Sequence, residues 1–287
     1  MDPERPDLDL IELKNFNARV FLRDQRLQVV DARGELAGVE VDLTADMQLS
    51  PAPENESERK AAREAADRRM DLMREHRSQM QLGLDWLKRF EFQHRPLLTV
   101  GVRGSTRSLE DLVAEIELVV RDFRYRGYQC RELLVEAGYS NEEADLKRLR
   151  LQDSLGSLEA SAQWRRGEES VAFRVTSSAD LRSAAEVLLD SDALREGVFY
   201  ERGPGLALEG TLFFGETAAG MARPVDLRGE IHSPRFTSRG EVFEELRASF
   251  GVNGQGIYVR DGLLRHKTGT LALQVLVHEE QGLRYRA

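Results

Sequence analysis

The 287-residue sequence contains a single cysteine, Cys130. One cysteine excludes an intrachain disulfide framework and a cysteine-rich zinc site. No apolar run approaches the roughly 18 residues that a membrane helix needs, and residues 1–6 do not follow the pattern of a signal peptide. Lys and Arg number 41 against 50 Asp and Glu, a net charge of −9. Because phosphates repel an acidic chain, nucleic acid is not an expected partner.

The sequence also lacks the motifs of the common catalytic sites. The histidines show neither an HxH nor an HExxH spacing, so no zinc site is expected; they are His76, His94, His232, His266 and His278. Residues 101–106 lack the spacing of a phosphate loop, residues 251–256 do not fit a dinucleotide fingerprint, and both are predicted to be turns. No GxSxG occurs, and Cys130 lies in a predicted strand as a packed thiol. We therefore expect no enzymatic activity, no cofactor and no metal.

What the sequence has in abundance is apolar residues at every second position, which is typical of strands with one buried face. Such runs occupy about residues 39–49, 98–102, 114–120, 158–164, 171–175, 206–214 and 271–277. Turn signals separate them at residues 31–34, 166–168, 253–254 and 267–269. Short connections favour antiparallel neighbours. The predicted fold class is mainly β, a long curled antiparallel meander sheet.

Two segments break this period. From about Glu54 to Gln93 the apolar residues follow a helical spacing, which predicts a long amphipathic helix that stops before Pro96. We expect it as an insertion over residues 54–95, with its Met and Leu stripe packed on the sheet; an intermolecular coiled coil is the alternative. A second, short helix is expected over about Ser178–Leu189.

The chain also repeats itself. Residues 123–162 align without a gap on 236–275 at an offset of 113, with nine of forty positions identical, among them Gly127 with Gly240. A partial third copy matches Arg26 and Asp31 with Arg148 and Asp153 at an offset of 122. We expect a single elongated domain over 1–287 with repeat units at about 8–50, 114–164 and 227–277. Some fifteen strands at about 4.8 Å spacing would make a sheet about 70 Å long, which must twist and curl.

Three pieces of this chain carry a resemblance to a known family: residues 149–162 (LRLQDSLGSLEASA), 123–133 (FRYRGYQCREL) and 175–181 (VTSSADL). They resemble the AsmA-like proteins of bacterial envelopes, relatives of TamB, which are similar to the bridge-like lipid-transfer proteins. The resemblance implies a β-groove that carries phospholipid or other acyl-chain lipid through the periplasm, with inner- and outer-membrane proteins as partners. Family members have an amino-terminal membrane helix. Its absence here implies a segment of a larger protein, anchored through a part outside this chain.

If the sheet curls around lipid, one set of alternating apolar residues should share its concave face. The expected lining is Val39, Val41, Leu43, Val100, Val102, Ile116, Leu118, Val120, Leu158, Ala160, Leu271, Leu273 and Val275. The polar residues between them, such as Glu40, Asp42, Glu115, Glu117 and Glu159, should face solvent. The alternative is a structural or interaction module of the envelope, in which the same face is a fully packed core and carries no lipid.

Overall fold

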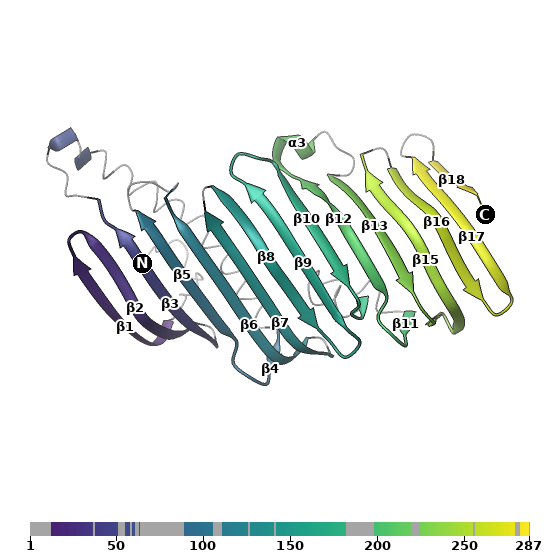
Figure 1. The fold of residues 1–287 in the computed structure, drawn as a ribbon, viewed down its shortest axis with the longest axis horizontal. Coiled ribbons are helices and arrows are strands. Elements are labelled where there is room, and N and C mark those ends of the chain that lie inside the picture. Colours follow the sequence, from purple (N-terminus) through teal and green to yellow (C-terminus); the bar gives the residue numbers. More distant parts are fainter. Residues whose placement is uncertain are drawn as a thin grey trace, which may run out of the picture.

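The computed structural model describes residues 13–50, 89–105, 111–181, 198–219, 224–278 and 282–286, apart from residues 37, 126, 141 and 255, together with residues 55–57, 59, 60 and 63. Within this part of the chain, eighteen strands join one sheet (Figure 1). The prediction of a mainly β, predominantly antiparallel long sheet is confirmed.

The strands follow one another across the sheet in nearly the order of the sequence. Their bounds are β1 (Leu13–Arg23), β2 (Arg26–Leu36), β3 (Val39–Gln48), β4 (Glu91–Phe92), β5 (Leu97–Ser105), β6 (Val113–Tyr125), β7 (Tyr128–Ser140), β8 (Glu143–Gln152), β9 (Ser157–Arg165), β10 (Ser170–Ser177), β11 (Val198–Tyr200), β12 (Gly205–Phe213), β13 (Val225–Ser233), β14 (Phe236–Ser238), β15 (Glu241–Asn253), β16 (Gly256–His266), β17 (Gly269–His278) and β18 (Gly282–Arg286). The short β4 pairs with β6, and β11 pairs with β14, which pairs with β15. A five-residue helix, α3 (Gly215–Ala219), follows β12.

One neighbouring pair departs from the meander. β3 and β5 run parallel, with Leu43 opposite Val100, whereas every other pair in the described sheet is antiparallel. Parallel neighbours need a long connection, and the chain supplies one, because residues 49–96 separate the two strands apart from the short β4. The sequence-based expectation of a wholly antiparallel meander is wrong at this point.

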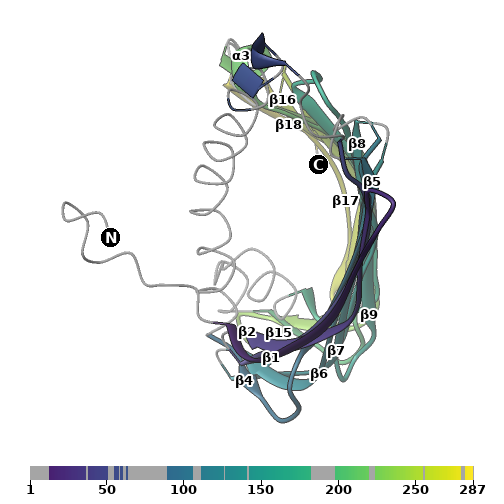
Figure 2. The same cartoon turned by 90° about the vertical axis from the view of Figure 1, so that its left-hand side faces the viewer.

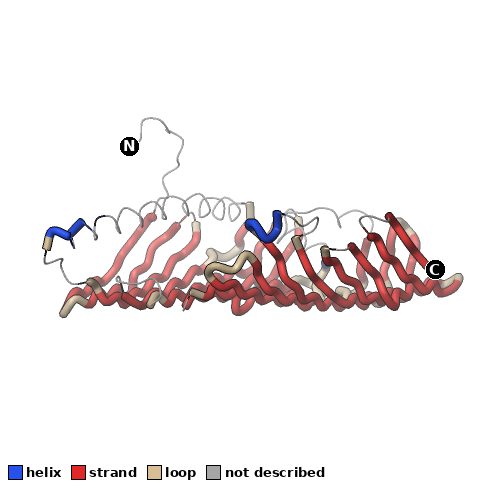
Figure 3. The backbone as a smooth tube through the Cα atoms, turned by 90° about the horizontal axis from the view of Figure 1, so that it is seen from above, coloured by secondary structure: helices blue, strands red, loops and turns tan. Residues whose placement is uncertain are grey.

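The sheet is long and bent. In Figure 2 the strands curve, so that the sheet has a concave and a convex side, and Figure 3 shows the same strands as one extended layer. Twist accumulates in any sheet of this size because each strand is rotated relative to its neighbour. No helix among the described residues is long and apolar enough to cross a membrane.

Strand bounds recur at the offset found in the sequence. When 113 is added to the residue numbers that bound β7, β8 and β9, the results match the bounds of β15, β16 and β17 to within one residue at each end. An irregularity recurs as well: the register shifts between Leu146 and Leu149 in β8 and between Val259 and Gly262 in β16. A bulge adds a residue to one strand and bends it, so the two segments share both strand order and a local deformation.

The third copy has a different register from the one expected. Asp31 and Gly34 lie inside β2, whereas Asp153 and Gly156 lie in the loop between β8 and β9. Strand bounds of β1, β2 and β3 correspond to those of β7, β8 and β9 at an offset near 117, not 122. The predicted turn at residues 31–34 is therefore a bulge, in which Asp31 has a φ of 50°. Residues 101–104, also predicted as a turn, lie within β5.

The predicted helices lie mostly outside the described residues. Of the segment 54–95, residues 56, 57, 59, 60 and 63 are helical, but Glu91 and Phe92 form β4, so the helix does not reach residue 93. Of the segment 178–189, Ser178, Ala179 and Asp180 are not helical, and only Leu181 is. Ser178 and Asp180 instead fold against the sheet, for reasons given below.

Candidate functional site

All thirteen residues of the expected lining lie on one face of the sheet. Directly paired residues in neighbouring strands point to the same side. Val41 pairs with Leu98, Leu98 with Leu118, and this succession continues across the sheet to Val275. Since side chains alternate along each strand, the other members of the set fall on the same side. We call this side the apolar face, and the opposite side the polar face.

Two uninterrupted rows of apolar residues cross the strands from β3 to β17 on this face. The first row is Val41, Leu98, Leu118, Val135, Leu149, Ala160, Val175, Leu208, Gly229, Phe250, Val259 and Val275. The second is Leu43, Val100, Ile116, Ala137, Leu146, Ala162, Phe173, Gly210, Leu227, Val252, Ile257 and Val277. No polar side chain interrupts either row.

The expected lining has no member of these rows from β7, β8, β10, β12, β13, β15 or β16, although the sequence predicts the alternating runs at about 171–175 and 206–214 that become β10 and β12. In β7 the run Leu133-Leu134-Val135 hides the period of two, and in β8 and β16 the bulges shift it by one residue. The internal repeat was the available signal, because residues that align at the offset of 113 lie on the same face, in neighbouring rows. Leu146 and Val259, for example, both border a bulge on the apolar face.

The apolar face is also the less exposed one. Along β10 and β13, half-buried residues on the apolar face alternate with exposed residues on the polar face. Glu40, Glu115, Glu117 and Glu159 on the polar face are exposed, and Asp42 is half-buried. The alternation gives the sheet one side from which water is partly excluded and one that is solvated.

One end of the apolar face is a packed core. Phe90 and Ala179 pack there with Val120, Phe123, Tyr125, Cys130, Leu133, Leu151 and Leu158. Two residues of the expected lining, Val120 and Leu158, are consequently only 1% and 6% exposed, and Val39, outside this cluster, is 3% exposed. In contrast, Ile116 and Leu271 are 42% and 44% exposed. The lining thus divides into a closed part, at one end of β6–β9, and an open part that includes Ile116 and Leu271.

A buried carboxylate fastens a loop across this closed end. Asp153 is 4% exposed, and its Oδ1 accepts hydrogen bonds from the amides of Leu155 and Gly156 at 2.7 and 2.8 Å. Its Oδ2 accepts a third from the Asp180 amide at 2.7 Å. Three backbone donors satisfy the hydrogen-bonding needs of a carboxylate away from water. These bonds explain why the Asp153 carboxylate can be buried. It holds the segment 177–181 against the loop between β8 and β9.

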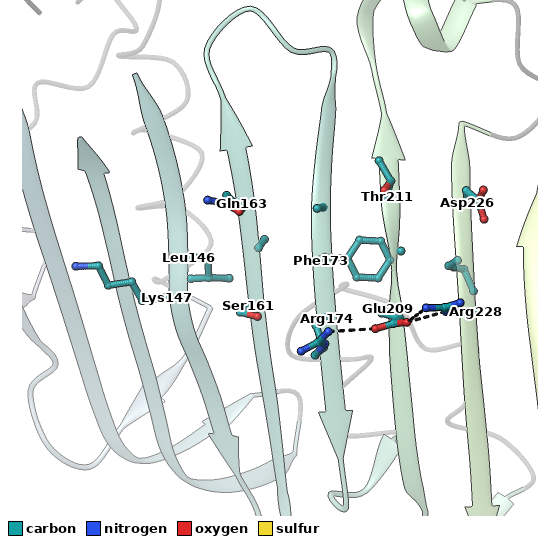
Figure 4. Close-up of a pocket in the computed structure, with 14 residues that line it drawn as sticks. Leu146, Lys147, Ser161, Gln163, Phe173, Arg174, Glu209, Thr211, Asp226 and Arg228 are labelled. Carbon is teal, nitrogen blue, oxygen red and sulfur yellow. Dashed lines mark hydrogen bonds and ion pairs between the residues drawn. The ribbon is translucent and has the colours of Figure 1, made fainter. Parts of the chain in front are cut away.

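The polar face is lined with ion pairs. Glu209 of β12 accepts hydrogen bonds from Arg228 of β13 and Arg174 of β10, at 2.6 and 3.2 Å, beside a shallow hollow that Lys147 also lines (Figure 4). These bonds, that of Arg228 foremost, hold the pKa of the Glu209 carboxyl below its ordinary value. All three side chains are exposed to solvent. Exposed pairs of this kind contribute little stability and mark a solvated surface.

A second acidic residue on the polar face, Glu245, is surrounded by basic groups. Partial burial opposes its ionisation, but Arg247 and Arg265 outweigh that effect and lower the pKa of the Glu245 carboxyl. His232 lies 3.4 Å from the same carboxylate. Each cluster sets two arginines around one glutamate, a net charge of +1, on a chain whose net charge is −9.

The described residues contain no group of histidine, cysteine and acidic side chains that could hold a metal ion. Cys130 is fully buried in β7, and its burial, together with the charge of Asp153, raises the pKa of the thiol to about 12. A thiol with that pKa carries almost no thiolate at neutral pH, and thiolate is the nucleophile. Cys130 therefore belongs to the packed core.

Comparisons of this chain with protein-family models, with curated proteins and with solved structures find no match.

Proposed function

We propose that this protein binds the acyl chains of lipids along its apolar face and has no enzymatic activity. The observation that carries this proposal is the pair of apolar rows, which cross the sheet from β3 to β17 without a polar residue. A core that merely stabilises a domain needs no such continuity over this length. A hydrocarbon chain lying across the strands does need it.

The differences in exposure support the assignment of the apolar face to the concave side. Side chains converge on the inside of a curved sheet and diverge on the outside, so residues on the inside lose more of their contact with water. At Gly229 on the apolar face, a Cβ would lie 2.4 Å from Leu208 Cδ2 and 3.0 Å from Phe250 Cζ. Both neighbours lean over the glycine from adjacent strands.

The open part of the face is where lipid would bind. Ile116 and Ile257 stand in the same row and are 42% and 37% exposed. Covering such side chains with hydrocarbon is favourable by about 25 cal/mol per Å² of apolar surface removed from water. Because no polar group fixes a ligand in the rows, bound chains would slide along them, with their headgroups outside the apolar face.

A role in lipid transport or outer-membrane assembly in the periplasm is the biological setting that fits this binding mode. It rests on the resemblance of residues 123–133, 149–162 and 175–181 to AsmA-like proteins, and none of the three comparisons adds to it. The partners in that setting would be phospholipid and envelope membrane proteins. The binding of acyl chains rests on the rows themselves and is tested without reference to the setting.

Paired substitutions on the two faces test the proposal. The double variant Ile116→Asp and Ile257→Asp places two charges in the open part of the second row. We expect it to keep its folding but to lose at least about 90% of bound lipid, since a carboxylate among hydrocarbon chains costs several kcal/mol. The matched control, Glu117→Gln with Arg260→Gln, changes the same strands on the polar face and should bind lipid normally. Lipid is measured by mass spectrometry after purification and by uptake of a fluorescent fatty acid.

A substitution at the closed end separates this proposal from the packed structural module. Val120→Asp buries an unpaired charge in the core cluster and should unfold the protein. If Ile116→Asp with Ile257→Asp unfolds it equally, the whole face is packed and the structural module is correct. A folded double variant that still binds lipid at the original level would refute the assignment of the face.

A further inference from the structure

The first strand of the sheet has an unusual surface. Four apolar residues of β1 are exposed: Phe16 at 51%, Val20 at 59%, Phe21 at 54% and Leu22 at 67%. Val20 and Leu22 pair with Val29 and Leu27 and so lie on the apolar face, whereas Phe21 pairs with Gln28 on the polar face. The strand therefore exposes apolar side chains on both of its sides.

Among the described residues, β1 pairs with β2 over eleven residues and with no other strand. An edge of this length is a template for another strand, and proteins ordinarily protect such edges with charge, proline or a covering element. The exposed side chains and the free edge coincide on one strand.

Equivalent strands within the molecule show what such an edge normally meets. β15 corresponds to β1 at an offset near 230, and its Phe250 and Val252 correspond to Val20 and Leu22. Both are half-buried, because β13 pairs with β15 on the side that is free in β1. The side chains of β1 thus have the character of residues that a neighbouring antiparallel strand covers.

We propose that a second copy of this chain pairs with β1, so that two β1 strands lie antiparallel about a two-fold axis perpendicular to the sheet. Such an axis keeps both apolar faces on the same side. With the axis at Arg19, Phe16 of one copy lies opposite Leu22 of the other, and Ala18 opposite Val20, so apolar residues meet apolar residues. Each Arg19 retains its ion pair with Asp31 of its own chain.

Other occupants fit the strand less well. A bilayer would leave the free N–H and C=O groups of β1 without partners, which is costly in hydrocarbon. Head-to-tail pairing with β18 would engage only five residues of that strand and would leave part of the apolar surface of β1 uncovered. A two-fold contact at Arg19 uses residues 15–23 of β1, and closed two-fold dimers are the commonest assemblies of soluble proteins. The proposal does not depend on lipid binding.

Sedimentation and cross-linking test the pairing. The 32.5 kDa chain should sediment as a dimer at high concentration. Val20→Lys, which sets a charge beside the axis in both copies, should raise the dissociation constant at least about tenfold, equivalent to about 1.4 kcal/mol. Leu271→Lys is the matched control, because Leu271 is also an exposed apolar residue but lies in β17, within the sheet. It should leave the dimer intact.

Single cysteines identify the contact. Arg19→Cys, which lies at the axis opposite the same residue of the other copy, should form a disulfide-linked dimer with itself under mild oxidation, whereas Thr44→Cys, exposed in the interior strand β3, should not. The buried Cys130 should not react in either variant. Arg19→Cys that links only to a cysteine placed in β18 would establish head-to-tail pairing instead. A monomer at every soluble concentration, or assembly only on phospholipid vesicles, would overturn the proposal.

Discussion

Cys130 shows how far one buried side chain departs from its behaviour in water. Its pKa in the folded protein is about 12, against about 8.5 in an unfolded chain. Between these two values the unfolded chain loses the proton while the folded protein keeps it. Rising pH therefore favours unfolding. The contribution of the protonated thiol to the free energy of unfolding is fully present below about pH 8.5 and declines above it.

We predict that stability falls with alkaline pH by up to about 1.4 kcal/mol per unit above pH 8.5 on account of this thiol. Cys130→Ala removes the titrating group and should flatten the curve, although it lowers stability at neutral pH by leaving a small cavity. Urea unfolding of both proteins from pH 7 to 10 measures the difference. Parallel curves would show that the thiol ionises as easily in the folded state as in the unfolded one.

Single residues were predictable from the sequence where the strand period was regular. Ile116 and Leu118 fell on the expected face because β6 alternates without interruption in that region. Their exposure was not predictable, since Val120 is 1% exposed and Ile116 is 42% exposed on the same strand and face. Phe90 and Ala179, which belong to the same core cluster as Val120, come from segments whose positions no local pattern specifies.

At the scale of elements, the segment 177–181 depends on two glycines that let the backbone approach the sheet. A Cβ at Gly203 would lie 1.7 Å from the Ser178 carbonyl oxygen, and one at Gly156 would lie 2.3 Å from the same atom. The Ser178 amide also donates to the Ser157 carbonyl at 2.7 Å. The close approach explains why residues 178–180 are not helical, although the sequence predicts a helix from about Ser178.

We predict that Gly203→Ala destabilises the protein by about 1–3 kcal/mol, since overpacking at a fixed backbone contact has that cost. Gly254→Ala is the control: it adds the same methyl group in the turn after β15, where nothing lies within 4 Å. That variant should change stability by less than about 0.5 kcal/mol. Thermal unfolding compares the two variants. Equal melting temperatures would mean that the backbone at Ser178 can shift to make room for the methyl group at little cost in stability.

Strands in which apolar residues recur at every second position were predicted from the sequence. Features that depend on pairing between distant segments were not. The parallel placement of β3 beside β5 is a choice between sheet edges far apart in the chain, which no window of the sequence contains. The bulge at Asp31 has a turn-like composition, so it was predicted as a turn. Phe92 pairs with Phe123 as a strand, although its neighbours in the sequence continue a helical period.

At the scale of the whole molecule, contacts are almost confined to neighbouring strands. In such a one-dimensional array, each strand is stabilised by its neighbours and by whatever packs on its face. The core cluster gives β6, β7, β8 and β9 an additional layer of packing. β1 at one end of the described sheet has only one neighbour and exposed side chains. Stability should therefore vary along the molecule.

We predict that hydrogen exchange is slowest in β6–β9 and at least about tenfold faster in β1 and β17, because local opening requires less free energy where fewer buried contacts are broken. The pairing proposed for β1 predicts that hydrogen exchange in β1, but not in β17, depends on protein concentration. Protection of β1 should rise with protein concentration in the original chain but not in Val20→Lys, whereas protection of β17 should be the same in both. Uniform protection along the sheet would show instead that the strands unfold as one cooperative unit, and that the core cluster stabilises distant strands as strongly as those it contacts.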